Sequence, residues 1–585
     1  MNTTNNPAKS NKRLVFFVVG AVAIVFCCII FAIVASVSTK LYKENSTISS
    51  KAVGDDTFDP DASLDYSNVS QEPFVSGQFL PKVNGFAFQN YGNESGMQNL
   101  TPAQMYDMFG KNVCLNGSRE NCKLNNVAET WMLEVNNNLQ IGHCAGFTIL
   151  SNFMKSGYVS PSKFGGSNAY ALSQSNKELQ SEIAKWASYQ FISNSYTQPI
   201  NSTPAEVINI LSKPFPADGY MLLVFQPGYK AGHAVTPTRV IDAGSGKYKI
   251  GIYDNNLPGI ERYVDVNTSS NTWSYYATIN PGYPEAEYSG DDFTQTLLLV
   301  RTDLMKNKPD CGDKCEVSHN YLEDETSSAT SKSTSSNSTT SADEVNFDNE
   351  QKLAIEHQII FSTNNEFEIT DPNGNRFTYK NGEIEDKSNS ISFVPIVSGV
   401  LWNDSLPPVV NLEKSGVYKM RVYKGEKKSA DFAYFNKTYA FKMQESLIID
   451  DYADLSVDTQ TMTVTVDTKS IKPNNVEVEN TYDDYDQTLN FEDMDFYDDS
   501  FEFSLDSENN AEYSMDGLKE TELTIDRSSA DGDNSLKYNL KFSEEEARQI
   551  DLYIHSSDNP IMFEADMKVL NMVKDLEKLF EEIYP

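Results

Sequence analysis

The chain has 585 residues, a formal net charge of −36 at pH 7 and a pI of about 4.5. A surface this acidic repels nucleic acids and anionic membrane surfaces, so both are excluded as binding partners. The length allows two or three domains, and an aromatic content of 11% argues against a largely disordered acidic protein.

The N-terminal segment carries a long apolar run. Residues 14–36 contain no charged side chain and follow a basic cluster at residues 9–13. A bilayer-spanning helix needs roughly 20 apolar residues, whereas the apolar part of a cleaved signal peptide has about 7–15. Because basic residues stay on the cytoplasmic side, the sequence predicts a cytoplasmic tail over 1–13, a transmembrane anchor over 14–36 and an extracytoplasmic remainder. The predicted location is therefore the cell membrane, with a single pass, unless cleavage near Ser36 releases the protein.

Four of the seven cysteines form two closely spaced pairs. Cys114 and Cys122 bracket a short polar loop, and Cys311 and Cys315 bracket another. In an oxidising compartment these pairs predict two local disulfides, although four cysteines allow three pairings. A zinc site of Cys311, Cys315 and His319 is the weaker alternative because it lacks a fourth ligand, so no metal is expected.

Changes in composition divide the rest of the chain. A Ser-, Asp- and Asn-rich stalk precedes a globular segment, and a Ser/Thr-rich linker separates this segment from acidic segments with the alternating pattern of strands. The predicted boundaries are 37–78 for the stalk, 79–323 for the globular domain, 324–349 for the linker, 350–467 for a β-sandwich-like domain and 468–585 for an acidic β-rich domain with a C-terminal helix.

The globular segment places helices before strands. Thr101, Pro102 and Gly110 have the positions of an N-cap, a first helical residue and a terminating glycine, which predicts a helix over 102–109. The patterns predict further helices over 127–137 and 176–191, and strands over 219–226, 232–241, 247–254, 271–279 and 294–302. This order is typical of an α+β domain with an antiparallel sheet.

Of the three remaining cysteines, Cys27 and Cys28 lie in the predicted membrane span, and Cys144 is left without a partner. An odd thiol in an exported chain is a candidate for a reactive group. Gly142 allows a tight turn just before it, and residues 144–156 have the apolar spacing of a helix. At the start of this helix, the positive end of the macrodipole would favour a thiolate. The alternative is an inert buried thiol, since free cysteine is often buried.

A nucleophilic thiol needs a base and a group that orients the base. His233 begins a predicted strand, and the hairpin that follows brings Asp254 back beside it. Asn255 or Asn256 would take the place of Asp254 if the register is shifted. Taken alone, His233 is also compatible with a core histidine whose hydrogen bonds are satisfied.

Together, a cysteine at a helix start, "GHAV" on a strand and an acid closing the next strand resemble the papain-like cysteine peptidases over residues 79–303. The bacteriocin-leader-processing and staphopain-type branches are the most similar. The resemblance implies a helical part and a barrel-like sheet on either side of a cleft, where a thiolate–imidazolium pair cleaves amide bonds. It also implies that Cys144 is the nucleophile, His233 the base and Asp254 the orienting residue.

Two amides just upstream of Cys144 are the candidate oxyanion donors. Gln140 and Asn138 are both close enough in sequence to donate to a developing oxyanion. The oxyanion glutamine of the family stands six positions before the cysteine, where this chain has Asn138. The tryptophan that often follows the family's cysteine is replaced by Ala145.

The predicted architecture is an α+β papain-like catalytic domain, preceded by one transmembrane helix and followed by β-sandwich-like modules. The predicted function is that of a membrane-anchored, extracytoplasmic cysteine peptidase or amidase without a cofactor. It would cleave a peptide or protein substrate through a thioester acyl-enzyme. The β modules are expected to bind a surface partner or to position the catalytic domain. A transglutaminase-like acyltransferase and a catalytically inactive surface adhesin stay open as alternatives.

Overall fold

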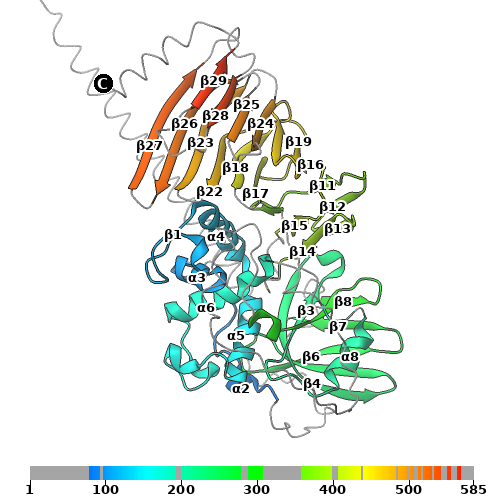
Figure 1. Cartoon of the computed structure of the whole chain (residues 1–585). Helices are drawn as coiled ribbons and strands as arrows, with labels where there is room; N and C mark the ends of the chain where they lie inside the picture. Colours follow the sequence, from blue (N-terminus) through cyan, green and yellow to red (C-terminus); the bar gives the residue numbers. More distant parts are fainter. Residues whose placement is uncertain are drawn as a thin grey trace, which may run out of the picture. The chain divides into compact units, whose positions relative to one another are not determined.

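The structure is a computed structural model of the chain, and it describes residues between 78 and 567 (Figure 1). The described residues are 78–92, 96–192, 199–201, 203–277, 287–306, 357–397, 399, 406–436, 439–481, 485–496, 500–505, 511–515, 518–529, 532–541, 550–554 and 563–567. Their α-helices all lie before residue 212, and their strands pair in antiparallel sheets.

The α-helices include the four that the sequence patterns predict. They are α2 (Pro81–Asn84), α3 (Pro102–Phe109), α4 (Asn126–Asn138), α5 (Cys144–Ser156), α6 (Lys177–Ser188) and α8 (Pro204–Leu211). Thr101 and Gly110 flank α3 as its N-cap and C-cap residues, which confirms that prediction. Gly146 allows α5 to approach α6 closely, because a Cβ atom at this position would collide with the carbonyl oxygen of Ile183.

A seven-stranded antiparallel sheet follows the helices in the chain. Its strands, in spatial order, are β8 (Glu287–Asp291), β7 (Thr272–Tyr276), β6 (Glu261–Asn267), β5 (Lys247–Tyr253), β4 (Gly232–Gly244), β3 (Tyr220–Phe225) and β9 (Leu297–Arg301). A separate pair of short strands, β1 (Cys114–Asn116) and β2 (Lys123–Leu124), closes a small loop near α3. The long helix α5 packs on β4, next to the central strand β5 of this sheet.

Two further antiparallel sheets are formed by the strands after residue 357. The first runs β14 (Ile391–Val394), β15 (Val409–Leu412), β10 (Gln358–Phe361), β17 (Ser429–Phe435), β18 (Tyr439–Ile448), β22 (Asn475–Thr481), β23 (Tyr485–Phe496), β26 (Leu518–Ser529) and β27 (Gly532–Lys541), with β21 (Ile471–Lys472) also on β18. The second runs β13 (Glu383–Asp386), β12 (Arg376–Lys380), β11 (Phe367–Thr370), β16 (Val417–Tyr423), β19 (Tyr452–Asp458), β20 (Thr463–Asp467), β24 (Ser500–Leu505), β25 (Ala511–Met515), β28 (Ile550–Ile554) and β29 (Phe563–Met567). Both sheets continue across the boundary expected at residue 467.

The predicted α+β papain-like fold class is wrong for the described chain, because antiparallel sheets make up most of its regular structure. The prediction weighed the helices and strands of residues 79–303, where the chemical motifs lie. It treated the later strands as appended β-sandwich-like modules. Those strands instead build two long sheets, and apolar side chains from β10, β14 and β17 enter the same core as the helices.

The predicted single-pass location in the cell membrane is also corrected. Within the described ranges, no helix has both the length and the apolar character needed to cross a membrane. The predicted span 14–36 itself lies outside the described residues. So do the stalk 37–77, the linker, the C-terminal helix and the pair Cys311 and Cys315.

Helix α4 connects the helical part to one of the long sheets. One hydrophobic core contains side chains of α4, α5 and α6 together with Val394 and Phe435 of the later strands. At the start of α4, the backbone N–H of Asn126 donates to Asp486 Oδ2 of β23 at 2.9 Å. Because burial of a shared apolar surface favours association, the helices and this sheet pack as one unit.

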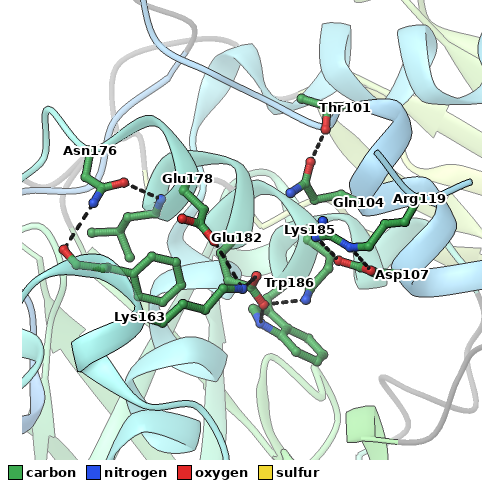
Figure 2. A network of polar contacts seen from close by, with 12 residues as sticks. Thr101, Gln104, Asp107, Arg119, Lys163, Asn176, Glu178, Glu182, Lys185 and Trp186 are labelled. Carbon is green, nitrogen blue, oxygen red and sulfur yellow. Dashed lines mark hydrogen bonds and ion pairs between the residues drawn. The ribbon is translucent and has the colours of Figure 1, made fainter. Parts of the chain in front are cut away.

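Glu182 anchors α6 through a buried network (Figure 2). Its carboxylate accepts a hydrogen bond from Trp186 Nε1 at 3.0 Å and pairs with Lys163 at 3.2 Å and with Lys185. Burial alone would raise the pKa of Glu182, but the charges and hydrogen bonds of Lys185 and Lys163 lower it. The network therefore keeps a buried carboxylate ionised and fixes the outer face of α6.

The loop between Cys114 and Cys122 is closed by a disulfide bond. Arg119, within the loop, donates from Nε and Nη2 to the two carboxylate oxygens of Asp107 at 2.6 and 2.7 Å (Figure 2). This two-point contact holds the loop against α3.

Asp486 makes the packing of α4 on β23 dependent on pH. Burial raises the pKa of Asp486 to about 7, although the hydrogen bond from Asn126 lowers it. The folded protein thus favours the protonated acid. The contribution of protonated Asp486 to the stability of the fold is complete below the ordinary pKa of about 4, and it is lost as the pH rises through 7.

We therefore expect Asp486→Asn to stabilise the folded chain increasingly as the pH is raised. The advantage should grow between about pH 4 and pH 7 and then level off at on the order of 1–4 kcal/mol. Thermal melts at a series of pH values measure it, with the exposed Asp450→Asn as the matched control. A pH-independent effect, or equal effects of both variants, would contradict the assignment.

Candidate active site

Cys144 lies where α5 meets the seven-stranded sheet. It is the first residue of α5, and Gly142, with φ +145°, turns the chain just before it. The Sγ atom accepts a hydrogen bond from the backbone N–H of Ala234 in β4 at 3.3 Å, and the side chain is fully buried. Because the first N–H groups of a helix have no acceptor within it, the thiol lies at the positive end of the α5 dipole.

His233 precedes Ala234 on β4 and is also fully buried. Its Nε2 atom lies 2.7 Å from Asp254 Oδ1. Burial alone would lower the pKa of His233, but the charge and hydrogen bond of Asp254, with a smaller effect of Cys144, raise it to about 10. The Nδ1 atom makes no hydrogen bond of regular geometry, yet the sulfur is close enough to affect the ring. The ring is therefore held as an imidazolium between an acid and a thiol.

Asp254 directly follows β5, which pairs with β4 in an antiparallel hairpin. This is the arrangement that the hairpin pattern predicts. Its carboxylate also accepts hydrogen bonds from the Tyr275 hydroxyl and, at 2.8 Å, from the backbone N–H of Asn256. Burial alone would raise the pKa of Asp254, but the charge of His233 and these hydrogen bonds lower it. Asp254 is thus held as an anion.

The two asparagines named as substitutes for Asp254 have other contacts. Asn255 Nδ2 donates to the carbonyl oxygens of Cys144 at 3.2 Å and of Ala234 at 2.9 Å. Its side chain therefore joins the start of α5 to β4. Asn256 supports Asp254 through its backbone, and its Nδ2 donates to the carbonyl oxygen of Gly399 at 2.5 Å.

Neither predicted oxyanion donor is aimed at this site. Gln140 is exposed, and its Nε2 donates to Asn137 Oδ1 at 3.3 Å. Asn138 is buried in the last turn of α4, where its Nδ2 donates to the carbonyl oxygen of Glu134 at 2.9 Å. Sequence proximity to Cys144 was misleading because both amides bind to residues of α4, which ends at Asn138, rather than to the site.

Asn90 is a site residue that the sequence analysis missed. Its Oδ1 accepts a hydrogen bond from the backbone N–H of His143 at 2.8 Å, directly before the nucleophile. A Cβ atom placed on Gly399 would collide with His233 Nδ1 and lie 2.9 Å from Asn90 Nδ2. Asn90 therefore places an amide beside the histidine and is a better candidate for the oxyanion donor. Nothing in the local sequence around Asn90 indicates this, since the contact is made only in the folded chain.

His143 has a structural role next to Cys144. Its Nδ1 lies 2.7 Å from the carbonyl oxygen of Tyr91, and its Nε2 lies 3.0 Å from Asn99 Oδ1. Burial lowers the pKa of His143 to about 4, although the hydrogen bond to Tyr91 raises it. The ring is therefore neutral, and its one N–H donates from Nδ1 to the Tyr91 carbonyl oxygen, which leaves His233 as the base.

For metal binding, the described ranges contain no group of three His, Cys, Asp or Glu side chains that is suitably arranged. The alternative zinc site of Cys311, Cys315 and His319 lies outside them.

The site has no assigned precedent in the comparisons. The chain matches no known family model, no curated protein and no solved structure.

Replacing Asp254 by Asn tests the ion pair. Without the carboxylate charge, burial is left as the main influence on the ring, so the pKa of His233 should fall from about 10 to below its ordinary 6.5. The imidazole should then be neutral at pH 7.5. NMR titration of the ring resonances measures this, with Asp265→Asn on β6 as the control. An imidazole that stays protonated at pH 8 in Asp254→Asn would contradict the assignment.

Proposed function

We propose that the chain is a cysteine hydrolase that cleaves peptide or amide bonds with Cys144, His233 and Asp254. The observation that carries the proposal is the buried group in which Asp254 binds Nε2 of His233 while the Cys144 sulfur accepts the N–H of Ala234, the next residue on β4. A thiol, an imidazole and an acid in this order can form a nucleophile and recycle its proton. The resemblance of the local motifs to papain-like cysteine peptidases points to the same chemistry.

The proposed reaction has two steps. The thiolate of Cys144 attacks the substrate carbonyl carbon, and the C–N bond breaks as the His233 imidazolium gives its proton to the leaving amine. This leaves a thioester and a neutral imidazole. Water then attacks the thioester while His233 takes its proton, and the thiolate leaves as the acid product is released. The proton balance returns the imidazolium for the next cycle.

Asp254 acts as the positioning residue in this scheme. Three groups donate hydrogen bonds to the Asp254 carboxylate and hold it in place. Because one of them is Nε2 of His233, the other ring nitrogen, Nδ1, faces away from the acid. Asn90 and the N–H groups at the start of α5 are the candidate donors to the oxyanion.

The proposal predicts that Cys144→Ala and His233→Asn abolish hydrolysis. Turnover of a mixed peptide library is followed by mass spectrometry. Each variant is made in a chain that also carries Gly399→Ala, and it is compared with Gly399→Ala alone, because Gly399 lies against the His233 ring and covers it. We expect a loss of at least roughly 10³-fold for each variant, as is usual when a nucleophile or its base is removed.

His357→Asn is the matched control for His233→Asn. His357 is also buried, but it lies directly before β10 and contacts the Tyr434 hydroxyl rather than the site. It should keep full turnover. Equal loss in His233→Asn and His357→Asn, or turnover that persists in Cys144→Ala, would contradict the proposal. Products that carry an added amine in place of hydroxide would instead indicate acyl transfer by the same residues.

A further inference from the structure

Gly399 lies in front of the candidate active site although it belongs to the C-terminal part of the chain. Its backbone N–H donates to the carbonyl oxygen of Gly232 at 3.0 Å, directly before His233. Its carbonyl oxygen accepts from Nδ2 of Asn256, the residue whose backbone N–H supports Asp254. The backbone of Gly399 thus binds the start of β4 through Gly232 and the side chain of Asn256, just after β5.

The fit at Gly399 excludes a side chain. Its φ is +74°, and a Cβ atom would collide with His233 Nδ1. His233 Nδ1 is the ring nitrogen that does not bind Asp254, so Gly399 covers the side of the ring that must exchange protons during hydrolysis. Gly399 is therefore where a reacting peptide group would have to lie.

The residues before Gly399 also contact β4 and the helical part of the chain. Val397 donates its backbone N–H to Gln190 Oε1 at 2.9 Å, and a Cβ atom on Gly232 would lie 2.8 Å from Val397 Cγ1. Val394, Ile396 and Val397 are buried in the core of the helical part.

An apolar cavity of about 180 Å³ lies beside this segment. Its wall combines Ala145 and Ile149 of α5 with Leu223 of β3, and Pro395 and Val397 close it. Ala145 directly follows Cys144 on α5, so the cavity lies next to the start of the helix that carries the thiol. An apolar pocket next to a row of backbone partners is typical of a peptide-binding cleft.

We propose that residues 394–397 and 399, here called the cleft segment, occupy the substrate cleft as an intramolecular inhibitor. This inference rests on the proposed function. The cleft segment binds through backbone hydrogen bonds and apolar side chains, which are the contacts that an extended peptide substrate would use. Because it is tethered, it competes at a high effective concentration with any peptide in solution. The fit at Gly399 further assigns a glycine requirement to the peptide position that faces His233.

The test compares two glycine substitutions in the full chain. Gly399→Ala introduces a Cβ atom against His233, whereas Gly374→Ala adds one where no atom lies within 4 Å, and both positions have a positive φ of +74° and +85°. Backbone strain is therefore matched. Only the first substitution should displace the cleft segment, and we expect it to raise the rate of Cys144 alkylation by iodoacetamide about tenfold or more.

The alkylated residue is identified by peptide mass spectrometry, which separates Cys144 from Cys27, Cys28, Cys311 and Cys315. Thermal melts and circular dichroism establish that both variants remain folded to the same degree. Equal alkylation of Cys144 in Gly399→Ala, Gly374→Ala and the unchanged chain would overturn the inhibitory role. Faster alkylation in both variants would also overturn it, because strain alone would then explain the effect.

This experiment separates the two proposals, since alkylation requires an accessible thiol but no hydrolysis. Fast alkylation of Gly399→Ala without any peptide turnover would overturn the hydrolase and leave the covering role intact. Peptide turnover together with equal alkylation rates of Cys144 in Gly399→Ala and the unchanged chain would support the hydrolase and overturn the covering role.

A peptide added in trans tests the glycine requirement. Acetyl-VPIVSG, the sequence of residues 394–399, should slow alkylation of Gly399→Ala by occupying the vacated cleft. The same peptide ending in alanine should protect at least about tenfold less well at equal concentration. Equal protection by the two peptides would overturn the glycine requirement.

Discussion

The buried ion pair between His233 and Asp254 is the interaction on which the rest of the site depends. Both side chains are fully buried, and buried charges are tolerated only when they are paired and hydrogen-bonded. Each partner reverses the effect of burial on the other, so the imidazolium and the carboxylate exist only together. Tyr275 and the Asn256 backbone complete the acceptor sites of the acid. The resulting orientation of the ring leaves Nδ1 on the side of the thiol and of Gly399.

The parts of the site that are local in the chain could be predicted from the sequence. The start of α5 at Cys144 follows from apolar spacing, and the meeting of His233 and Asp254 follows from one hairpin. The parts that depend on distant contacts could not. Asn90 precedes the nucleophile by several elements, and its amide enters the site only because its backbone N–H pairs with the carbonyl oxygen of Asn255. The family's spacing pointed to Asn138 and sequence proximity to Gln140, but the end of α4 holds both side chains in other contacts.

The fold shows the same difference between local features, which the sequence predicts, and contacts between distant residues, which it does not. Alternating apolar residues indicated strands after the linker, and β11 and β12 are two of them, joined in a hairpin by the Asn373–Gly374 turn. Alternation says which residues face a core, but not which strands share a sheet. The acidic strands after residue 467 therefore looked like a separate domain, although β22 continues the sheet of β18 and β24 continues that of β20. The core shared with the helices was equally hidden, because its members are separated by the linker.

The contacts of the cleft segment suggest how a covered site can remain intact. The polar contacts of Val397 and Gly399 use Gly232, Asn256 and Gln190, and none of them uses the Asp254 carboxylate or His233 Nε2. Glycines stand at the two closest approaches: Gly232 lies against Val397, and Gly399 lies against the His233 ring. The fit of the cleft segment therefore depends on residues without side chains. Displacing Val397 and Gly399 would break these three hydrogen bonds, each with a net value of about 1 kcal/mol. The hydrogen bonds of Asp254 are all made to other groups, namely His233, Tyr275 and the backbone of Asn256. The covering contact is therefore separable from the interaction that orients the histidine.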